Sequence, residues 1–146
     1  MGTFTVQNQF MLKQHNGNAI DLDTDTIKVM IVTNAYVPNQ AHAFKSDVTN
    51  EVVGVNYTAG GTTIAGVTLA LDVNVVEWIH NDITWTQSAV GFANGRTYIW
   101  YHDTAVAATS KLIGYMSEAS DFGNVAGDLT LDVTAGTGVL NINRTP

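Results

Sequence analysis

Residues 27–33 read Ile-Lys-Val-Met-Ile-Val-Thr, a run in which nearly every side chain is apolar or β-branched. Such a run is typical of a strand that is buried on both faces of a sheet. An acidic turn at residues 21–25 precedes it. Residues 34–44 contain Pro38, Asn39 and Gln40, so they cannot continue a sheet and predict a long loop. We therefore expect residues 27–33 to form a strand at the centre of the fold.

Beyond this strand the chain carries mainly strand and turn signals. A glycine-rich turn at residues 58–62 separates residues 55–57 from residues 63–71 and predicts a hairpin. Alternation of apolar and polar residues over 129–133 predicts a strand with one wet face. Other strands are expected at residues 75–80, 83–86, 97–102, 111–116 and 138–142. Roughly nine short strands predict an all-β fold, an antiparallel β-sandwich of jelly-roll-like or Ig-like form.

Helical signals are confined to the first third of the chain. Apolar residues within 3–14 follow the spacing of a short amphipathic helix, which Asn16 and Gly17 would end. Residues 46–51 predict one helical turn capped by Ser46. At 146 residues the chain is expected to hold one core. We predict an N-terminal arm or short helix over residues 1–20 and one β-sandwich domain over residues 21–146.

The composition excludes several classes of function. Six Lys and Arg stand against thirteen Asp and Glu, a formal net charge of −7, which makes nucleic acid and anionic membrane poor partners. The chain has no cysteine, which excludes disulfides, thiolate zinc sites and cysteine nucleophiles. It shows no signal-peptide pattern and no apolar run of about 18 residues, so we expect synthesis without secretion or membrane insertion. Charged residues make up only 13%, which suits a protein with large areas packed against neighbours.

Two patterns raise the question of a metal ion. Asp21, Asp23 and Asp25 alternate as the carboxylates of a calcium loop do, but Thr26 and Val32 occupy the positions where such a loop needs Gly and Glu. A solvated turn that leads into the strand is the favoured interpretation. The histidines are too far apart in sequence for a zinc motif; they are His15, His42, His80 and His102. The sequence predicts no metal and no cofactor.

Neither catalysis nor sugar binding has a clear signature. Ser88 or Ser110 could join a Ser-His-Asp set, yet no nucleophile-elbow or oxyanion-hole sequence accompanies either, so we predict that the protein is not an enzyme. An aromatic group could form a stacking platform for sugars or bases; its members are Trp78, Trp85, Tyr98, Trp100 and Tyr101. Strand alternation favours core packing instead, with Tyr98 and Trp100 on one face and Tyr101 on the other.

Several segments, in order, resemble a family of small structural proteins of tailed bacteriophages, especially those of marine bacteria and cyanobacteria. They are DLDTDTIKV at residues 21–29, TNAYVPNQ at 33–40, SDVTNEV at 46–52, YTAGG at 57–61, DITW at 82–85, and DT at 103–104 with ATSKLIGY at 108–115. The resemblance covers roughly residues 21–142 and carries no catalytic residue. The first twenty residues match only loosely, and residues 89–95 are particular to this chain.

This resemblance implies a virion protein that is assembled in the bacterial cytoplasm. It implies a capsid decoration (cement) protein on the capsid exterior, with the major capsid protein as its partner and a homo-oligomer, a trimer, as its state. The alternative that stays open is a tail or fibre component that binds host glycan, because one fold serves at several places in a particle.

Two segments outside the expected strands carry large apolar residues and are candidates for the surface that contacts the partner. The first lies near the N-terminus and the second in the loop of residues 34–44. The candidate interface residues are Phe4, Phe10, Met11, Tyr36, Val37, Pro38 and Phe44. The other interpretation is that these residues fold back as lids over the ends of the sandwich.

Overall fold

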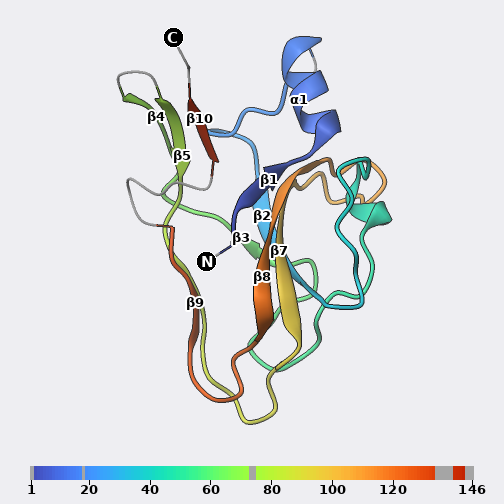
Figure 1. Cartoon of the computed structure of the whole chain (residues 1–146), viewed down its shortest axis with the longest axis vertical. Coiled ribbons are helices and arrows are strands. Elements are labelled where there is room, and N and C mark those ends of the chain that lie inside the picture. The colour runs from blue at the N-terminus through green and yellow to red at the C-terminus, as the bar shows by residue number, and fades with distance from the viewer. Residues whose placement is uncertain (1, 18, 73–74, 134–139, 144–146) are drawn as a thin grey trace.

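The computed structural model describes residues 2–17, 19–72, 75–133 and 140–143 (Figure 1). Strands take up 38% of the described residues and helices 9%. The helical elements are α1 (Asn8–His15) and the 3₁₀ turn η1 (Lys45–Asp47). The strands are β1 (Phe4–Val6), β2 (Ile27–Thr33), β3 (Thr62–Thr63), β4 (Thr68–Asp72), β5 (Val75–Ile79), β6 (Ile83–Trp85), β7 (Gly95–His102), β8 (Leu112–Phe122), β9 (Leu129–Leu131) and β10 (Leu140–Asn143). The predicted all-β class is confirmed.

The described strands form three antiparallel sheets. A five-stranded sheet has the order β1-β8-β7-β2-β3, and two smaller sheets have the orders β10-β5-β4 and β6-β9. Both smaller sheets lie on the same side of the five-stranded sheet, one beyond the other along the long axis (Figure 1). This layered arrangement is compatible with the predicted antiparallel sandwich.

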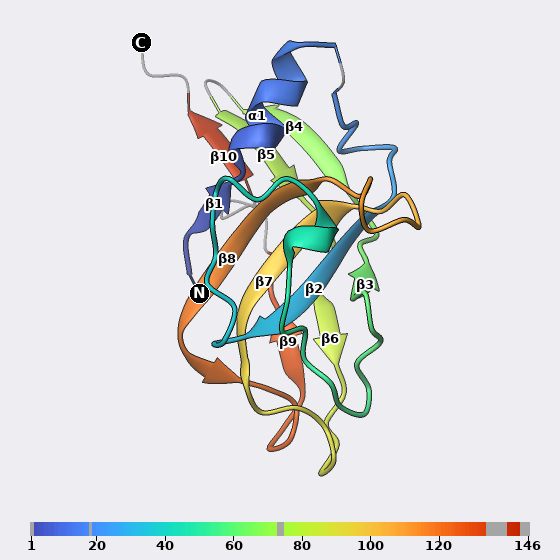
Figure 2. The ribbon, with the colours of Figure 1, turned by 90° about the vertical axis from the view of Figure 1, so that its right-hand side faces the viewer.

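The five-stranded sheet is buried on both faces at its centre. Val29 and Ile31 of β2 pack in a cluster with Trp78 and Trp85 from the smaller sheets. Met30 and Val32 point the other way, into a second cluster that the loop after β2 supplies with Tyr36 and Val48. Figure 2 shows this loop crossing the outer face of the sheet. The prediction of a strand at residues 27–33 with two buried faces is confirmed.

Strand β7 divides its aromatic side chains between the two clusters. Tyr98 and Trp100 belong to the cluster beneath the smaller sheets, whereas Tyr101 belongs to the cluster beneath the loop. All three are at most 4% exposed. The predicted alternation of these rings is therefore confirmed, and they are core residues.

The N-terminal segment differs from its prediction. Residues 4–6 form strand β1 on the edge of the five-stranded sheet, with Phe4 opposite Met116, and the helix begins only at Asn8. The Phe4 ring meets Trp100 edge-on at 5.2 Å between centroids, above Gly114, where a side chain on β8 would collide with it. The predicted helix over residues 3–14 is wrong before Asn8 because this long-range packing favours a strand.

The predicted hairpin at residues 55–71 is also wrong. Residues 55–57 are not a strand, β3 pairs with β2, and β4 pairs with β5. Glu51 explains the difference. Its Oε1 accepts hydrogen bonds from the Tyr57 hydroxyl at 2.7 Å and from the Gly60 N–H at 2.6 Å, which holds the segment as a turn against the sheet.

The short helical turn near Ser46 exists, but its cap was predicted wrongly. The turn spans Lys45–Asp47, and the Asp47 carboxylate accepts the N–H groups of Ala43 and Phe44, both at 2.9 Å. These hydrogen bonds hold the pKa of Asp47 below its ordinary value. A side chain at the end of the turn thus replaces the expected cap at Ser46. Of the strand predicted at residues 138–142, the first two residues lie outside the described part.

Candidate functional site

Helix α1 and the loop of residues 34–44 form one face of the molecule, which we call the docking face. The Asn8 N–H donates to the Gln40 carbonyl at 3.2 Å, and the Gln40 side-chain amide donates to the Val6 carbonyl at 3.2 Å. Gln7, between them, is 1% exposed. The N-terminal segment and the loop of residues 34–44 are therefore joined in space.

The structure separates the candidate interface residues into buried and exposed ones. Phe10 is 3% exposed and Tyr36 is 6% exposed, and the Tyr36 hydroxyl lies 2.8 Å from His42 Nδ1. Phe10 and Tyr36 therefore offer little surface to a partner, whereas Phe4 packs against Trp100 and is only partly buried. The burial of Phe10 and Tyr36 fits the lid interpretation, and contact of the seven residues with a partner stays a prediction.

The remaining candidates keep surface that a partner can reach. Val37 is 77% exposed and Met11 is 42% exposed, while Pro38 and Phe44 are partly buried. Leu12, beside Met11, is 53% exposed and was not among the predicted residues. Met11 and Leu12 are neighbours on α1, and Val37 lies on the loop that contacts the start of α1 through Gln40. Exposed apolar side chains on one face are a common mark of a protein interface.

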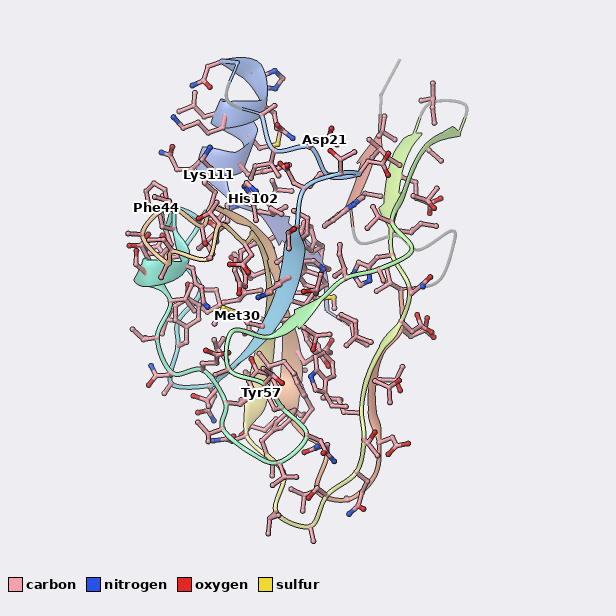
Figure 3. All side chains as sticks on the ribbon, turned by 180° about the vertical axis from the view of Figure 1, so that it is seen from behind. Asp21, Met30, Phe44, Tyr57, His102 and Lys111 are labelled. Carbon is pink, nitrogen blue, oxygen red and sulfur yellow. The ribbon has the colours of Figure 1, made fainter. Side chains whose placement is uncertain are left out.

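A pocket of about 260 Å³ opens between α1 and the start of β8. It is lined by Gln9, Phe10, Lys13, Ile20, Ala43, Phe44 and Lys111. Its lower wall is fixed by backbone contacts, since Phe44 bridges Lys111 and the Leu112 N–H donates to the Ala43 carbonyl at 2.9 Å. Figure 3 shows Phe44 and Lys111 side by side below α1. The pocket is thus a preformed part of the docking face.

A wider hollow of about 510 Å³ lies between β8 and β9, with Tyr98 and Phe122 among its lining residues. Tyr98 stacks on Phe122 at 4.6 Å and on Trp85 at 6.2 Å between centroids. Sugar binding by stacking needs an open ring face, and neighbouring rings stack on Tyr98. The aromatic cluster therefore supports core packing rather than a glycan platform.

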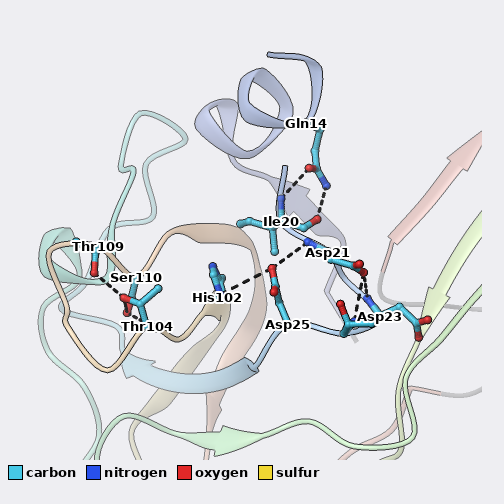
Figure 4. Close-up of polar contacts among 10 residues, drawn as sticks. Gln14, Ile20, Asp21, Asp23, Asp25, His102, Thr104, Thr109 and Ser110 are labelled. Carbon is cyan, nitrogen blue, oxygen red and sulfur yellow. Dashed lines mark hydrogen bonds and ion pairs between the residues drawn. The ribbon is translucent and has the colours of Figure 1, made fainter. Parts of the chain in front are cut away.

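The acidic residues before β2 form a turn. Asp21 Oδ1 accepts the N–H groups of Asp23 at 3.0 Å and Thr24 at 3.2 Å, and Asp25 Oδ2 accepts the Asp21 N–H at 3.0 Å (Figure 4). These hydrogen bonds lower the pKa of Asp21. Within the described residues no three His, Asp or Glu side chains gather as metal ligands would. The predicted acidic turn before β2 is present, and its carboxylates accept backbone N–H groups within the turn.

Ser110 is engaged in holding its own loop. Its hydroxyl donates to the Val106 carbonyl at 2.9 Å and accepts the Thr104 N–H at 3.1 Å. His102 Nε2 faces Asp25 at 3.8 Å (Figure 4). A nucleophilic serine needs a hydrogen bond to its base, and the hydroxyl proton of Ser110 is directed to a backbone carbonyl instead. The geometry gives this serine a structural role.

His80 is a buried histidine whose tautomer is fixed by its neighbours. Nδ1 lies 2.7 Å from the Asn81 carbonyl and so donates to it, and Nε2 accepts the indole N–H of Trp100 at 3.1 Å. His80 is 3% exposed. Desolvation lowers its pKa, although the hydrogen bond to Asn81 and the charge of Asp82 act in the opposite direction. A proton on Nε2 would break the bond to Trp100.

We expect the free energy of unfolding to fall as pH falls below 6.5. The unfolded chain protonates His80 near its ordinary pKa of 6.5, whereas the folded chain resists protonation, so acid favours the unfolded state. The slope from this residue reaches at most about 1.4 kcal/mol per pH unit. Urea titrations between about pH 7.5 and about pH 5 should show it, because carboxylates titrate mainly at lower pH.

Two variants separate His80 from the other titrating groups. His80→Gln should be less stable at neutral pH but should lose most of the slope, since Gln does not titrate. His15→Gln, at an exposed position, should keep the wild-type slope. An unchanged slope in His80→Gln would contradict the assignment.

Comparison with known proteins adds no relative. No protein-family description, no curated protein and no solved structure matches this chain. Among the described residues, no helix is long and apolar enough to cross a lipid bilayer.

Proposed function

We propose that this chain is a structural protein of a tailed-bacteriophage particle, a capsid decoration protein that binds the major capsid protein on the outside of the head. The observation that carries the proposal is the group of exposed apolar side chains on the docking face, among them Val37 at 77% and Leu12 at 53% exposure. The resemblance over residues 21–142 supports the choice of a virion protein. The all-β fold suits the rigid platform that such a protein needs.

The physical role follows from linkage between binding and assembly. A protein that binds adjacent capsid subunits adds free energy that exists only in the assembled shell, and this stabilises the shell against the pressure of packaged DNA. Apolar anchors in interfaces can each contribute about 2 kcal/mol. The net charge of −7 keeps the protein away from the genome.

We expect Val37→Asp to weaken attachment to the particle by about tenfold or more, because a buried carboxylate would replace an apolar contact. The matched control is Leu71→Asp, whose side chain is 75% exposed on strand β4 of the β10-β5-β4 sheet, outside α1 and the loop of residues 34–44. Cosedimentation of each variant with particles measures attachment. Since both positions are exposed, both variants should melt near the wild-type temperature. Equal attachment of the two variants would contradict the docking face.

The number of copies per particle tests the position in the virion, and the mass of the assembled protein tests its oligomeric state. A capsid decoration protein is present in many copies per particle, and quantitative mass spectrometry of purified particles should find this. A few copies, with binding on a glycan array, would instead indicate a tail or fibre component. We propose a trimer on the shell, since closed symmetry is the rule for homo-oligomers. A monomer both in solution and on the particle would contradict that state.

A further inference from the structure

Some of the positively charged side chains of this acidic chain have interaction partners and others have none. The chain has only six Lys and Arg. Three of them have partners: Lys28 pairs with Asp103 at 2.6 Å, Arg96 pairs with Asp121 at 3.0 Å, and Lys45 lies over the Tyr101 ring at 5.1 Å. Within the described part of the chain, Lys13 and Lys111 have no ion pair, side-chain hydrogen bond or ring partner. Both line the same pocket of about 260 Å³.

The floor of that pocket is apolar. Phe10 and Ile20 are each 3% exposed and pack in the core, and Ala43 and Phe44 form the opposite wall. A lysine lays its methylene stem along apolar surface and keeps its ammonium group at the edge. The pocket therefore combines an apolar interior with a positive rim, in a protein whose net charge is −7.

Asp47, whose carboxylate contacts the backbone of two pocket residues, does not pair with the two lysines. Asp47 accepts the N–H groups of Ala43 and Phe44, both at 2.9 Å, and makes no ion pair with either lysine. An anion bound in this pocket would be attracted by both lysines that line it. A ligand that fits has an apolar body and a negative charge.

We infer that this pocket binds a segment of the partner protein in which an apolar side chain lies next to a carboxylate. The pocket is slightly smaller than usual small-molecule sites, which begin at about 300 Å³, and suits one side chain. It also belongs to the docking face, since Phe10 and Lys13 lie on α1 and Phe44 ends the loop that carries Val37. The inference rests on the proposed function and names the chemistry by which the docking face recognises its partner.

A pair of small probes tests the chemistry directly. N-acetylphenylalanine carries an apolar ring and a carboxylate, and its amide twin lacks only the charge. In NMR titrations of the full chain, the carboxylate probe should shift the amides around Lys13, Phe44 and Lys111 saturably, and the amide twin should bind about tenfold more weakly. Equal binding of the two probes, or no binding of the carboxylate, would overturn the inference.

Charge variants then connect the pocket to the particle. The double variant Lys13→Gln/Lys111→Gln should bind the carboxylate probe about tenfold more weakly and should attach to particles about tenfold more weakly. The control double variant Asn94→Asp/Ala126→Asp changes the net charge by the same amount at exposed positions outside the pocket. It should leave probe binding and attachment to particles unchanged. Attachment that survives the lysine variant but not Val37→Asp would overturn the pocket while the proposed function stands. Probe binding by a wild-type chain that never attaches to particles would overturn the proposed function alone.

Discussion

Asn124→Ala should lower the free energy of unfolding by about 3–5 kcal/mol, because Asn124 joins three loops from inside the protein. Its side chain is fully buried. Oδ1 accepts the Phe92 N–H at 3.0 Å, and Nδ2 donates to the carbonyls of Val55 at 3.1 Å and Thr86 at 2.8 Å. Alanine would leave the Phe92 N–H and the Val55 carbonyl without this partner, while the Thr86 carbonyl would keep the Asn56 side-chain amide at 3.1 Å. Each unsatisfied buried group costs about 1–3 kcal/mol.

The matched control is an asparagine on the surface. The Asn34 side chain is exposed and donates to the Asp121 carboxylate at 3.1 Å. Asn34→Ala should change the free energy of unfolding by about 0.5 kcal/mol or less. Urea denaturation of both variants at one pH measures the difference. Similar losses in the two variants would show that water can replace the buried amide.

Strands with apolar residues on both faces could be predicted from the sequence. Residues 27–33 and 97–102 are buried on both sides, so their composition alone marks them, and the described structure has β2 at Ile27–Thr33 and β7 at Gly95–His102. Residues 4–6 could not be assigned in this way. Phe4 follows the helical spacing of its neighbours, and the strand depends on long-range contacts, namely the pairing with β8 and the packing against Trp100.

The candidate site was harder to predict for a physical reason. Tyr36 and Val37 are adjacent apolar residues in one loop, yet one is 6% and the other 77% exposed. Composition cannot separate them, because the direction of each side chain depends on how the loop crosses the sheet. The pocket was even harder to predict from the sequence. Lys13 and Lys111 come from α1 and from the bridge before β8, and no local spacing connects them.

The turn before β3 could be recognised from its glycines, but the strand that pairs with β3 could not be predicted. The motif at residues 58–62 predicted a hairpin, whereas the structure uses it to bring β3 against β2, with Thr62 opposite Val29. Gly61 adopts φ +80°, a left-handed conformation that an L side chain rarely takes. A Cβ atom at Gly61 would also overlap the backbone carbonyl of Val29.

Gly61→Ala should therefore destabilise the protein by about 3 kcal/mol. The left-handed conformation accounts for about 1 kcal/mol, and displacing the backbone of a central strand accounts for the rest. Gly17→Ala measures the conformational contribution alone. Gly17 follows α1 at φ +81°, and an added methyl group there would have no neighbouring atom within 4 Å. This variant should therefore lower the free energy of unfolding by only about 1 kcal/mol. Gly127→Ala, with open space and no positive φ, should be close to neutral.

The comparison between Gly61→Ala and Gly17→Ala decides how rigid the edge of the five-stranded sheet is. The two glycines share a backbone conformation and differ in whether an added methyl group meets the backbone of β2. If urea denaturation shows that both variants lose the same free energy of unfolding, β3 can move away from β2 at little cost in free energy. A larger loss in Gly61→Ala means that the Thr62–Val29 pairing holds β3 in place. Only a fixed β3 keeps the glycine turn close enough for the Gly60 carbonyl to accept the hydrogen bond from Tyr101 in the core.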